Sequence, residues 1–239
     1  MLSHSTLAHL RFDLRAIFRL AQNDGLLARN PAELLHTPQG LVREAHVLSL
    51  QEAITILSVL GLRERLVVKL AGTCGMRPGE IVALQWHDLS EHALIAERRV
   101  YRGKIDTPKT PNTNRKVALP TSVVDDITEW RSIAHNTHPE AWVFPSENGK
   151  TPLWANNAWY DKIRPTLKNV GLGWVNFQVL RRSAVTLLNA TGADGTIVAA
   201  QCGHTVGVST NLYNKIGIER QLQAVQTLDN ALNTRPSIA

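Results

Sequence analysis

Residues 177–213 read FQVLRRSAVTLLNATGADGTIVAAQCGHTVGVSTNLY, and this stretch decides the fold that we expect for the whole chain. Its first part has apolar residues at helical spacing, which predicts a helix with one buried face. Arg181 and Arg182 then lie on the opposite side of that helix. The residues that set the spacing are Leu180, Ala184, Leu187 and Leu188.

Two glycines and an aspartate mark the expected helix ends in the rest of the stretch. Gly192 suits a left-handed helix end, and Asp194 is expected to cap a short second helix that ends at Gly203. His204 is then presented by a tight turn, and a small polar segment leads to Tyr213. Each residue alone is more often structural than functional, but together two cations, an imidazole and a phenol suit phosphoryl transfer.

The stretch resembles the C-terminal signature of the tyrosine recombinases, the phage integrase family. In that family His-x-x-Arg precedes Leu-Gly-His and a nucleophilic tyrosine, and the matching residues here are Gln178 to Arg181, Cys202-Gly203-His204 and Tyr213. Gln178 stands where the family has its first histidine. A glutamine amide still donates a hydrogen bond to a phosphate oxygen, but it carries no proton at neutral pH.

A second motif, GMRPGEIVALQWHDL at residues 75–89, is similar to the first-arginine motif of the same family. Pro78 favours the first helical position, so Arg77 should lie at a helix N-terminus, where an anion is favoured. Glu80 falls in the first turn and is expected to orient the guanidinium of Arg77. The alternative is a purely structural pair between Arg77 and Glu80.

Between these motifs the periodicity changes toward strands at 93–96, 100–105 and 115–119, which predicts a small antiparallel sheet. The polar residues 106–114, DTPKTPNTN, form the loop before the last strand. The resemblance places a catalytic lysine in this loop, where Lys109 is the best match. The alternatives are Lys104 and Lys116.

The remaining segments predict helices and no metal site. Thr121 is expected to cap a helix that ends near His135 and His138, whose spacing invites a metal interpretation that we reject because histidine is common near a helix C-terminus. Residues 154–167 are predicted as one helix in which Tyr160 packs among aromatic neighbours. The two cysteines, Cys74 and Cys202, are expected to be buried free thiols.

The pattern predicts three parts: a helical pair at 1–36, a linker at 37–47 and a main domain at 48–239. Two short helices cannot bury a core unaided, so the resemblance implies that 1–36 is the C-terminal remnant of a helical core-binding domain. The main domain is expected to be mainly α with a small antiparallel β-sheet. The resemblance identifies it as a tyrosine-recombinase-like catalytic domain with the DNA breaking-rejoining fold.

The main domain ends in an amphipathic helix at about 218–232. This helix either folds back onto its own domain or docks on a neighbouring protomer. The resemblance implies the second arrangement, with a homo-tetramer that assembles on DNA through this helix.

Charge and hydropathy fit a protein that acts on DNA. The 239 residues carry a formal net charge of +6 with a pI near 9.6, which permits a polyanionic partner. No apolar run reaches the length of a membrane span, and the first residues lack the apolar region of a signal peptide, which predicts a cytoplasmic protein.

The resemblance implies a site-specific DNA recombinase, or integrase, that acts on double-stranded DNA through a covalent 3′-phosphotyrosine, with no cofactor. Tyr213 is the expected nucleophile, Arg77 and Arg181 clamp the phosphate, Lys109 protonates the leaving oxygen and His204 assists. The residues expected to bind DNA are Arg77, Lys109, Arg181, Arg182 and His204. The alternative is a DNA-binding module that keeps this fold but has lost or weakened strand transfer.

Overall fold

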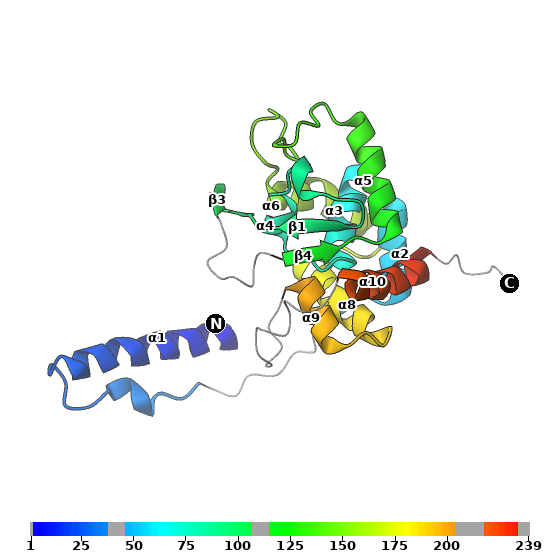
Figure 1. Ribbon diagram of the computed structural model, residues 1–239. Coiled ribbons are helices and arrows are strands. Elements are labelled where there is room, and N and C mark those ends of the chain that lie inside the picture. Colours follow the sequence, from blue (N-terminus) through cyan, green and yellow to red (C-terminus); the bar gives the residue numbers. More distant parts are fainter. Residues whose placement is uncertain (1, 38–45, 107–114, 204–217, 234–239) are drawn as a thin grey trace. The chain divides into compact units, whose positions relative to one another are not determined.

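A computed structural model describes residues 2–37, 46–106, 115–203 and 218–233, and the chain divides into two compact units, 1–45 and 46–239 (Figure 1). Three of the expected catalytic residues, Lys109, His204 and Tyr213, lie outside the described residues. Among the described helices, none is long and apolar enough to cross a membrane.

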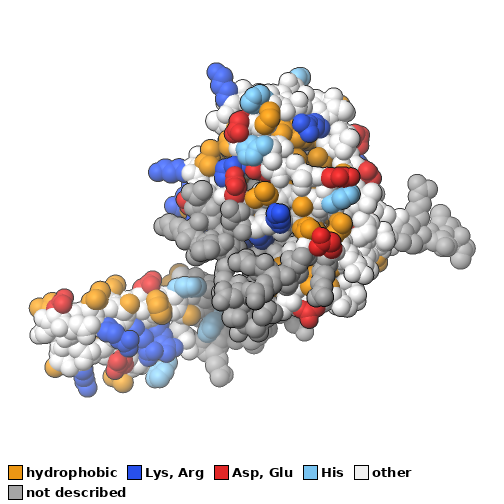
Figure 2. All heavy atoms as spheres, viewed as in Figure 1, with side chains coloured by type: hydrophobic (Ala, Val, Ile, Leu, Met, Phe, Trp, Pro, Cys, Tyr) orange, Lys and Arg blue, Asp and Glu red, His pale blue; other side chains and the backbone are white. Residues whose placement is uncertain are grey.

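The first unit consists of α1 (His4–Asn23) and the 3-10 helix η1 (Pro31–Leu34). Asn30 caps η1 by accepting a hydrogen bond from the N–H of Ala32 at 2.9 Å, and its amide donates to the carbonyl of Arg15 at 2.9 Å. Arg15 in turn donates to the carbonyls of Ala32 and Glu33 at 3.0 and 2.6 Å. Apolar side chains remain on the surface of this unit (Figure 2): Leu10, Phe12, Ile17 and Leu20.

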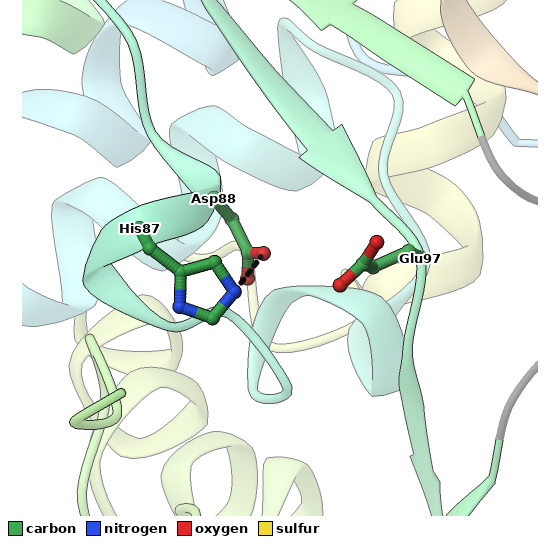
Figure 3. Close-up of side chains that lie close together, drawn as sticks. All are labelled: His87, Asp88 and Glu97. Atoms are coloured by element: carbon green, nitrogen blue, oxygen red, sulfur yellow. Dashed lines mark ion pairs between the residues drawn. The ribbon is translucent and has the colours of Figure 1, made fainter. Parts of the chain in front are cut away.

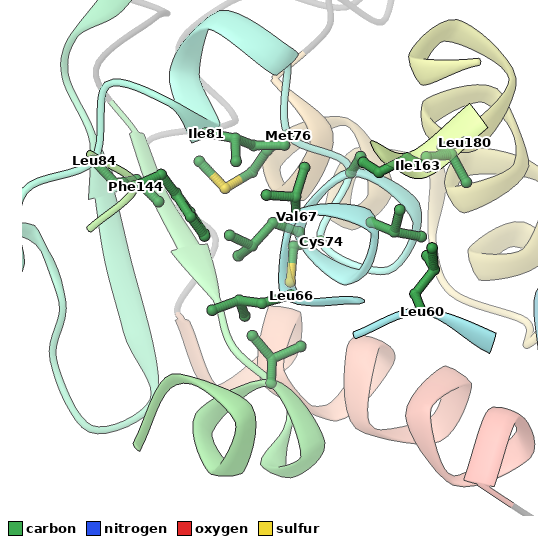
Figure 4. Close-up of a cluster of buried hydrophobic side chains, with 14 of the residues drawn as sticks. Leu60, Leu66, Val67, Cys74, Met76, Ile81, Leu84, Phe144, Ile163 and Leu180 are labelled. Atoms are coloured by element: carbon green, nitrogen blue, oxygen red, sulfur yellow. The ribbon is translucent and has the colours of Figure 1, made fainter. Parts of the chain in front are cut away.

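The second unit is built around α3 (Leu62–Gly72), which is buried over most of its surface. It packs against α2 (Leu50–Val59), α5 (Thr121–Ile133) and α8 (Phe177–Ala190). Close-packed side chains of the main core join these helices to the strands, to Met76 and to Ile81, the last residue of α4 (Pro78–Ile81) (Figure 4). A unit of this kind holds its surface turns rigidly, because a dense interior resists displacement.

Two small antiparallel sheets replace the single sheet that we expected. β1 (Ala93–Ala96) pairs with β4 (Arg115–Ala118), and β2 (Arg99–Tyr101) pairs with β3 (Lys104–Asp106). The prediction of one strand over 100–105 is wrong, because Arg102 and Gly103 turn the chain with φ of 50° and 74°. Positive φ at both central residues is what a two-residue hairpin turn of type I′ requires.

The predicted helix over 154–167 is also interrupted. It consists of α6 (Ala155–Asn157), a π-helical turn η4 (Ala158–Ile163) and α7 (Arg164–Asn169). Pro165 has no N–H to donate into the preceding turn, which favours a change of hydrogen-bond pattern there. The expectation that Tyr160 packs among aromatic neighbours is wrong: Tyr160 is 58% exposed, and its neighbour Trp159 is the buried residue.

Shorter elements connect these parts: α4 (Pro78–Ile81), η2 (Trp86–Asp88) and α9 (Gly195–Cys202). As predicted, Asp194 caps α9 and Gly203 ends it with φ of 64°. Thr121 is not the cap of α5, because Pro120 occupies that position. The N–H and hydroxyl of Thr121 instead donate to Gln226 of the last helix.

That last helix, α10 (Ile218–Asn233), packs on its own unit against α2, α5, α8, α9 and β4. Val225 and Leu228 are fully buried, and the carboxylate of Asp229 accepts hydrogen bonds from the N–H and the hydroxyl of Ser122. Within the single chain that the structure describes, residues 218–233 therefore pack on their own unit. The fold is mainly α with small antiparallel sheets, which confirms the predicted class.

We predict that Gly79→Ala destabilises the second unit by about 1 to 3 kcal/mol, because a new methyl group must displace neighbouring atoms. A Cβ at Gly79 would lie 2.6 Å from the carbonyl oxygen of Val100, which is backbone of β2 and cannot rotate away. Urea unfolding monitored by circular dichroism measures the change. Gly195→Ala is the matched control, since a Cβ there meets nothing within 4 Å. Equal stability of the two variants would contradict the rigid contact of α4 with β2.

Candidate active site

Two glycine turns bring Arg77 and Arg181 together, although the residues come from α4 and α8. Gly75 and Gly203 both have positive φ, at 67° and 64°. The guanidinium of Arg77 donates to the carbonyl of Gly203 at 2.6 Å, and that of Arg181 donates to the same carbonyl at 3.4 Å. Arg181 also donates to the carbonyl of Gly75. Two guanidiniums thus meet at the residue that precedes His204 in the sequence.

Local structure explains where each arginine lies. Pro78 is the first residue of α4, so Arg77 occupies the N-cap with extended backbone, as its sequence context predicts. Asn176 caps α8 by accepting from the N–H of Val179 at 3.0 Å, which places Arg181 in the second turn of that helix. Ser183, fully buried, accepts from the N–H of Leu48 and fixes the same helix against the start of the unit.

Glu80 is buried beside Arg77, and its carboxylate accepts hydrogen bonds from the backbone of Arg77 and from the guanidiniums of Arg77 and Arg115. It accepts from the backbone N–H of Arg77 at 3.0 Å and from its guanidinium at 2.8 Å. Arg115 adds a bidentate contact at 3.1 and 2.9 Å. Burial alone would raise the pKa of Glu80, but these donors, Arg115 first, outweigh it and lower the pKa to about 2. Glu80 is therefore a carboxylate at every physiological pH.

Arg115 is the residue that sequence reasoning missed. It was expected only as the start of a strand, yet its side chain is 8% exposed and lies against Glu80. A second guanidinium further offsets the cost of burying the Glu80 carboxylate. Nothing in the sequence showed that Glu80 would be buried or which arginine would bind it.

The site carries an excess of positive charge. Arg77, Arg115 and Arg181 surround one carboxylate, Glu80. Burial lowers the pKa of Arg181 to about 10, and the like charges of Arg77 and Arg115 act in the same direction. A buried cation beside other cations is stabilised when an anion binds, so the arrangement is suited to hold a phosphate.

The other described candidates have different surroundings. Gln178 is exposed in the first turn of α8, three residues before Arg181, so the two share one face of the helix. Arg182 is half-buried and donates to the backbone carbonyl of His46 at 3.3 Å. Lys104 and Lys116, the alternatives to Lys109, are exposed on β3 and β4.

Both cysteines are buried free thiols, which confirms that prediction. Burial raises the pKa of the Cys202 thiol to about 11, and it raises the pKa of Cys74 further. A Cβ at Gly75 would lie 2.3 Å from the sulfur of Cys202. The cysteine therefore packs directly on the Gly75 turn and seats the end of α9.

Among the described residues, one group has metal-ligand geometry: His87, Asp88 and Glu97, whose ligand atoms lie within 4.8 Å of one another (Figure 3). Arg98 already binds both acids, with distances of 2.5 and 2.6 Å to Asp88 and 2.5 Å to Glu97. A guanidinium in contact with both carboxylates opposes a second cation there. This group is an ion-pair network around the buried Asp88.

Comparison with known proteins identifies the family that the sequence suggested. The model of the phage integrase family matches residues 41–219. A "Tyrosine recombinase XerC-like" protein of Caldanaerobacter subterraneus is 27% identical over 95% of this chain and 66% of its own length. The ICEBs1 integrase of Bacillus subtilis is 23% identical over 97% of the chain and 67% of its own length. The chain spans about two thirds or less of the first curated relatives.

Solved structures show the same fold. The Tn1549 transposon integrase, in complex with transposon right end DNA, superimposes with a TM-score of 0.73 at 19% identity and covers 93% of this chain and 78% of its own. A lambda integrase dimer bound to a COC′ core site gives 0.61 at 19% identity, with 91% and 83% covered. The fold predicted from the resemblance is confirmed.

We predict that Glu80→Gln reduces the free energy of unfolding most above pH 4.5 and progressively less in acid. The folded pKa of about 2 lies below the usual 4.5, so stability from the charged form is complete above pH 4.5 and is lost as pH falls toward 2. This difference between the folded and the usual pKa corresponds to about 3 kcal/mol of unfolding free energy. Urea unfolding of both proteins from pH 7 to pH 3 measures it.

The matched control is Glu147→Gln, which changes an exposed glutamate and should leave the pH dependence close to that of the unchanged chain. A constant difference between Glu80→Gln and the unchanged chain across this pH range would contradict the low pKa.

Proposed function

This chain belongs to the phage integrase family, and from that premise we propose that it is a site-specific DNA recombinase that cleaves and rejoins DNA through a covalent 3′-phosphotyrosine. The observation that carries the proposal is the meeting of the Arg77 and Arg181 guanidiniums at the carbonyl of Gly203. Two fixed cations at one point suit a phosphate whose charge increases in the transition state. The names of the relatives, tyrosine recombinase and integrase, agree with this chemistry.

In the proposed reaction the hydroxyl oxygen of Tyr213 bonds to phosphorus while the bond from phosphorus to the 5′ oxygen breaks. Arg77 and Arg181 hold the non-bridging oxygens. Lys109 supplies a proton to the departing 5′ oxygen, and His204 donates a hydrogen bond to the phosphate or assists the transfer of the phenolic proton. The reverse steps rejoin a strand, and the phosphotyrosine conserves the energy of the broken bond.

Glu80 supports this chemistry without touching DNA. Its carboxylate fixes the backbone and the guanidinium of Arg77, which limits the entropy lost when phosphate binds. Gln178 is proposed to donate a hydrogen bond to the same phosphate from the face of α8 that carries Arg181. Arg182 is proposed to contact the DNA backbone nearby.

Assembly and location are parts of the same proposal. The partner is double-stranded DNA, and the proposed active form is a homo-tetramer on DNA in the cytoplasm. Exchange of α10 between protomers would have to replace the contacts that Val225, Leu228 and Asp229 make within their own unit. Residues 1–36 are proposed to be part of a helical core-binding domain.

Covalent trapping tests the reaction. Nicked duplexes with a randomised central sequence are incubated with the full chain, denatured in detergent and recovered on a protein-binding filter. Sequencing of the retained DNA identifies the preferred duplex. We expect a detergent-resistant adduct, because a nick lets the cleaved fragment diffuse away and prevents rejoining. Duplex binding without any adduct would support the DNA-binding module instead.

We predict that Tyr213→Phe abolishes the adduct and leaves DNA affinity nearly unchanged, because only the hydroxyl bonds to phosphorus. Gel electrophoresis of the denatured reaction and a mobility-shift titration measure the two quantities. Tyr101→Phe and Tyr160→Phe are the controls, since these two tyrosines are 59% and 58% exposed. An adduct that survives Tyr213→Phe and disappears in either control would place the nucleophile elsewhere.

We predict that Gln178→Ala lowers the cleavage rate on the order of a hundredfold, the usual loss for one preorganised donor. Gln178→His should hold or raise the rate, because imidazole donates the same hydrogen bond and adds charge when protonated. Single-turnover rates on the trapped duplex measure both changes. A cleaving parent whose rate is the same with Gln178→Ala would remove this residue from the active site.

A further inference from the structure

Arg115 contacts both Glu80 and the end of α9, and it comes from a third element of the site, β4. Its guanidinium binds Glu80 through two hydrogen bonds, and its Nε donates to the carbonyl of Gln201 at 3.3 Å. The two side chains of the ion pair are 8% and 2% exposed. A bidentate contact between two buried groups fixes both of them more firmly than a surface pair does.

The turn at Gly203 rests on the same guanidinium. A Cβ at Gly203 would lie 2.6 Å from the central carbon of the Arg115 guanidinium and 2.7 Å from Nε and Nη1. The amide side chain of Gln201 adds two bonds of 3.0 Å to the N–H and carbonyl of Ala118 on the same strand. The end of α9 is thus fastened to β4, and the Gly203 carbonyl lies where Arg77 and Arg181 meet.

We propose that Arg115 is a positioning residue for strand cleavage, an inference that rests on the proposed function. It acts through two contacts: it holds Glu80, which orients Arg77, and it supports the turn whose carbonyl receives Arg77 and Arg181. Three of its five N–H groups bind these partners and its side chain is only 8% exposed, so little of the guanidinium is accessible to a phosphate.

Charge balance gives Arg115 a second effect. With Arg115 in place, the carboxylate of Glu80 has a buried counter-ion besides Arg77. Without it, Glu80 would be neutralised by Arg77 alone and would compete with a phosphate for that guanidinium. Arg115 therefore leaves more of the charge of Arg77 available to the substrate, which a residue that only stabilises the fold would not do.

The test compares Arg115→Gln and Arg115→Lys with Arg65→Gln on the duplex selected by covalent trapping. Arg65 makes a similar bidentate contact, at 3.1 and 3.0 Å to Asp126, between α3 and α5. We expect Arg115→Gln to slow single-turnover cleavage on the order of a hundredfold with DNA half-saturation nearly unchanged. The cleavage rate of Arg115→Lys should lie between those of Arg115→Gln and the parent, because lysine keeps the charge but lacks the planar, forked guanidinium. Arg65→Gln should lose stability and keep the rate.

A second measurement needs no DNA. Inorganic phosphate is titrated while NMR follows the guanidinium nitrogens of Arg77 and Arg181. We expect Arg115→Gln, or Arg115→Lys if the first variant does not fold, to weaken phosphate binding several-fold relative to Arg65→Gln. The same Arg115 variant should raise the pKa of Glu80 above its value of about 2, measured from its carboxyl carbon.

The outcomes separate the two proposals. If the parent forms no adduct, the proposed function fails, and the phosphate titration alone decides whether Arg115 positions the arginines. If the parent forms the adduct and the Arg115 variants cleave and bind phosphate as Arg65→Gln does, the inference about Arg115 is overturned while the function stands.

Discussion

The carboxylate of Glu80 is the constraint on which the arrangement of the site depends. It is buried, it stays ionised, and so it must be surrounded by donors. Those donors come from the N-terminus of α4 and from the first residue of β4, so the pair of Arg77 and Arg115 fixes the strand against the helix. Because β4 also receives the end of α9, one ionised group sets the geometry of three elements.

Close approach of the backbone is the second physical feature of the site. The sulfur of Cys202 occupies the space where a side chain at Gly75 would be, and the guanidinium of Arg115 does the same at Gly203. Both glycines also adopt positive φ, so each position is suited to glycine for two independent reasons. The two turns whose carbonyls accept hydrogen bonds from the arginines are therefore also turns with no space for a side chain.

A polar network continues from this core to the last helix. Lys69 of α3, buried, binds Asp126 at 2.9 Å and the carbonyl of Ser122 at 3.0 Å, and Ser122 donates to Asp229 of α10. With Val225 and Leu228 buried beside it, α10 is held by apolar and polar contacts together. Any exchange of α10 between protomers has to break both the apolar and the polar contacts, which raises the free energy needed to move this helix.

The sequence by itself determined the elements that depend on short-range chemistry. The helix ends at Gly192 and Gly203 and the cap at Asp194 follow from local backbone and hydrogen-bond preferences, and the ordered motifs around Arg77 and Arg181 identified the family. Local periodicity was insufficient at the turn formed by Arg102 and Gly103 and at the break before Pro165, where one or two residues change the hydrogen-bond pattern.

Only the tertiary structure decided which long-range partners meet. Arg115 lies 35 residues from Glu80 and 86 from Gln201, and no spacing rule selects it over the other arginines of the chain. The placement of α10 on its own unit was equally open, since its apolar face suits any apolar surface. Both depend on burial and on charge pairing across the folded unit, and these are properties of the assembled core rather than of any segment.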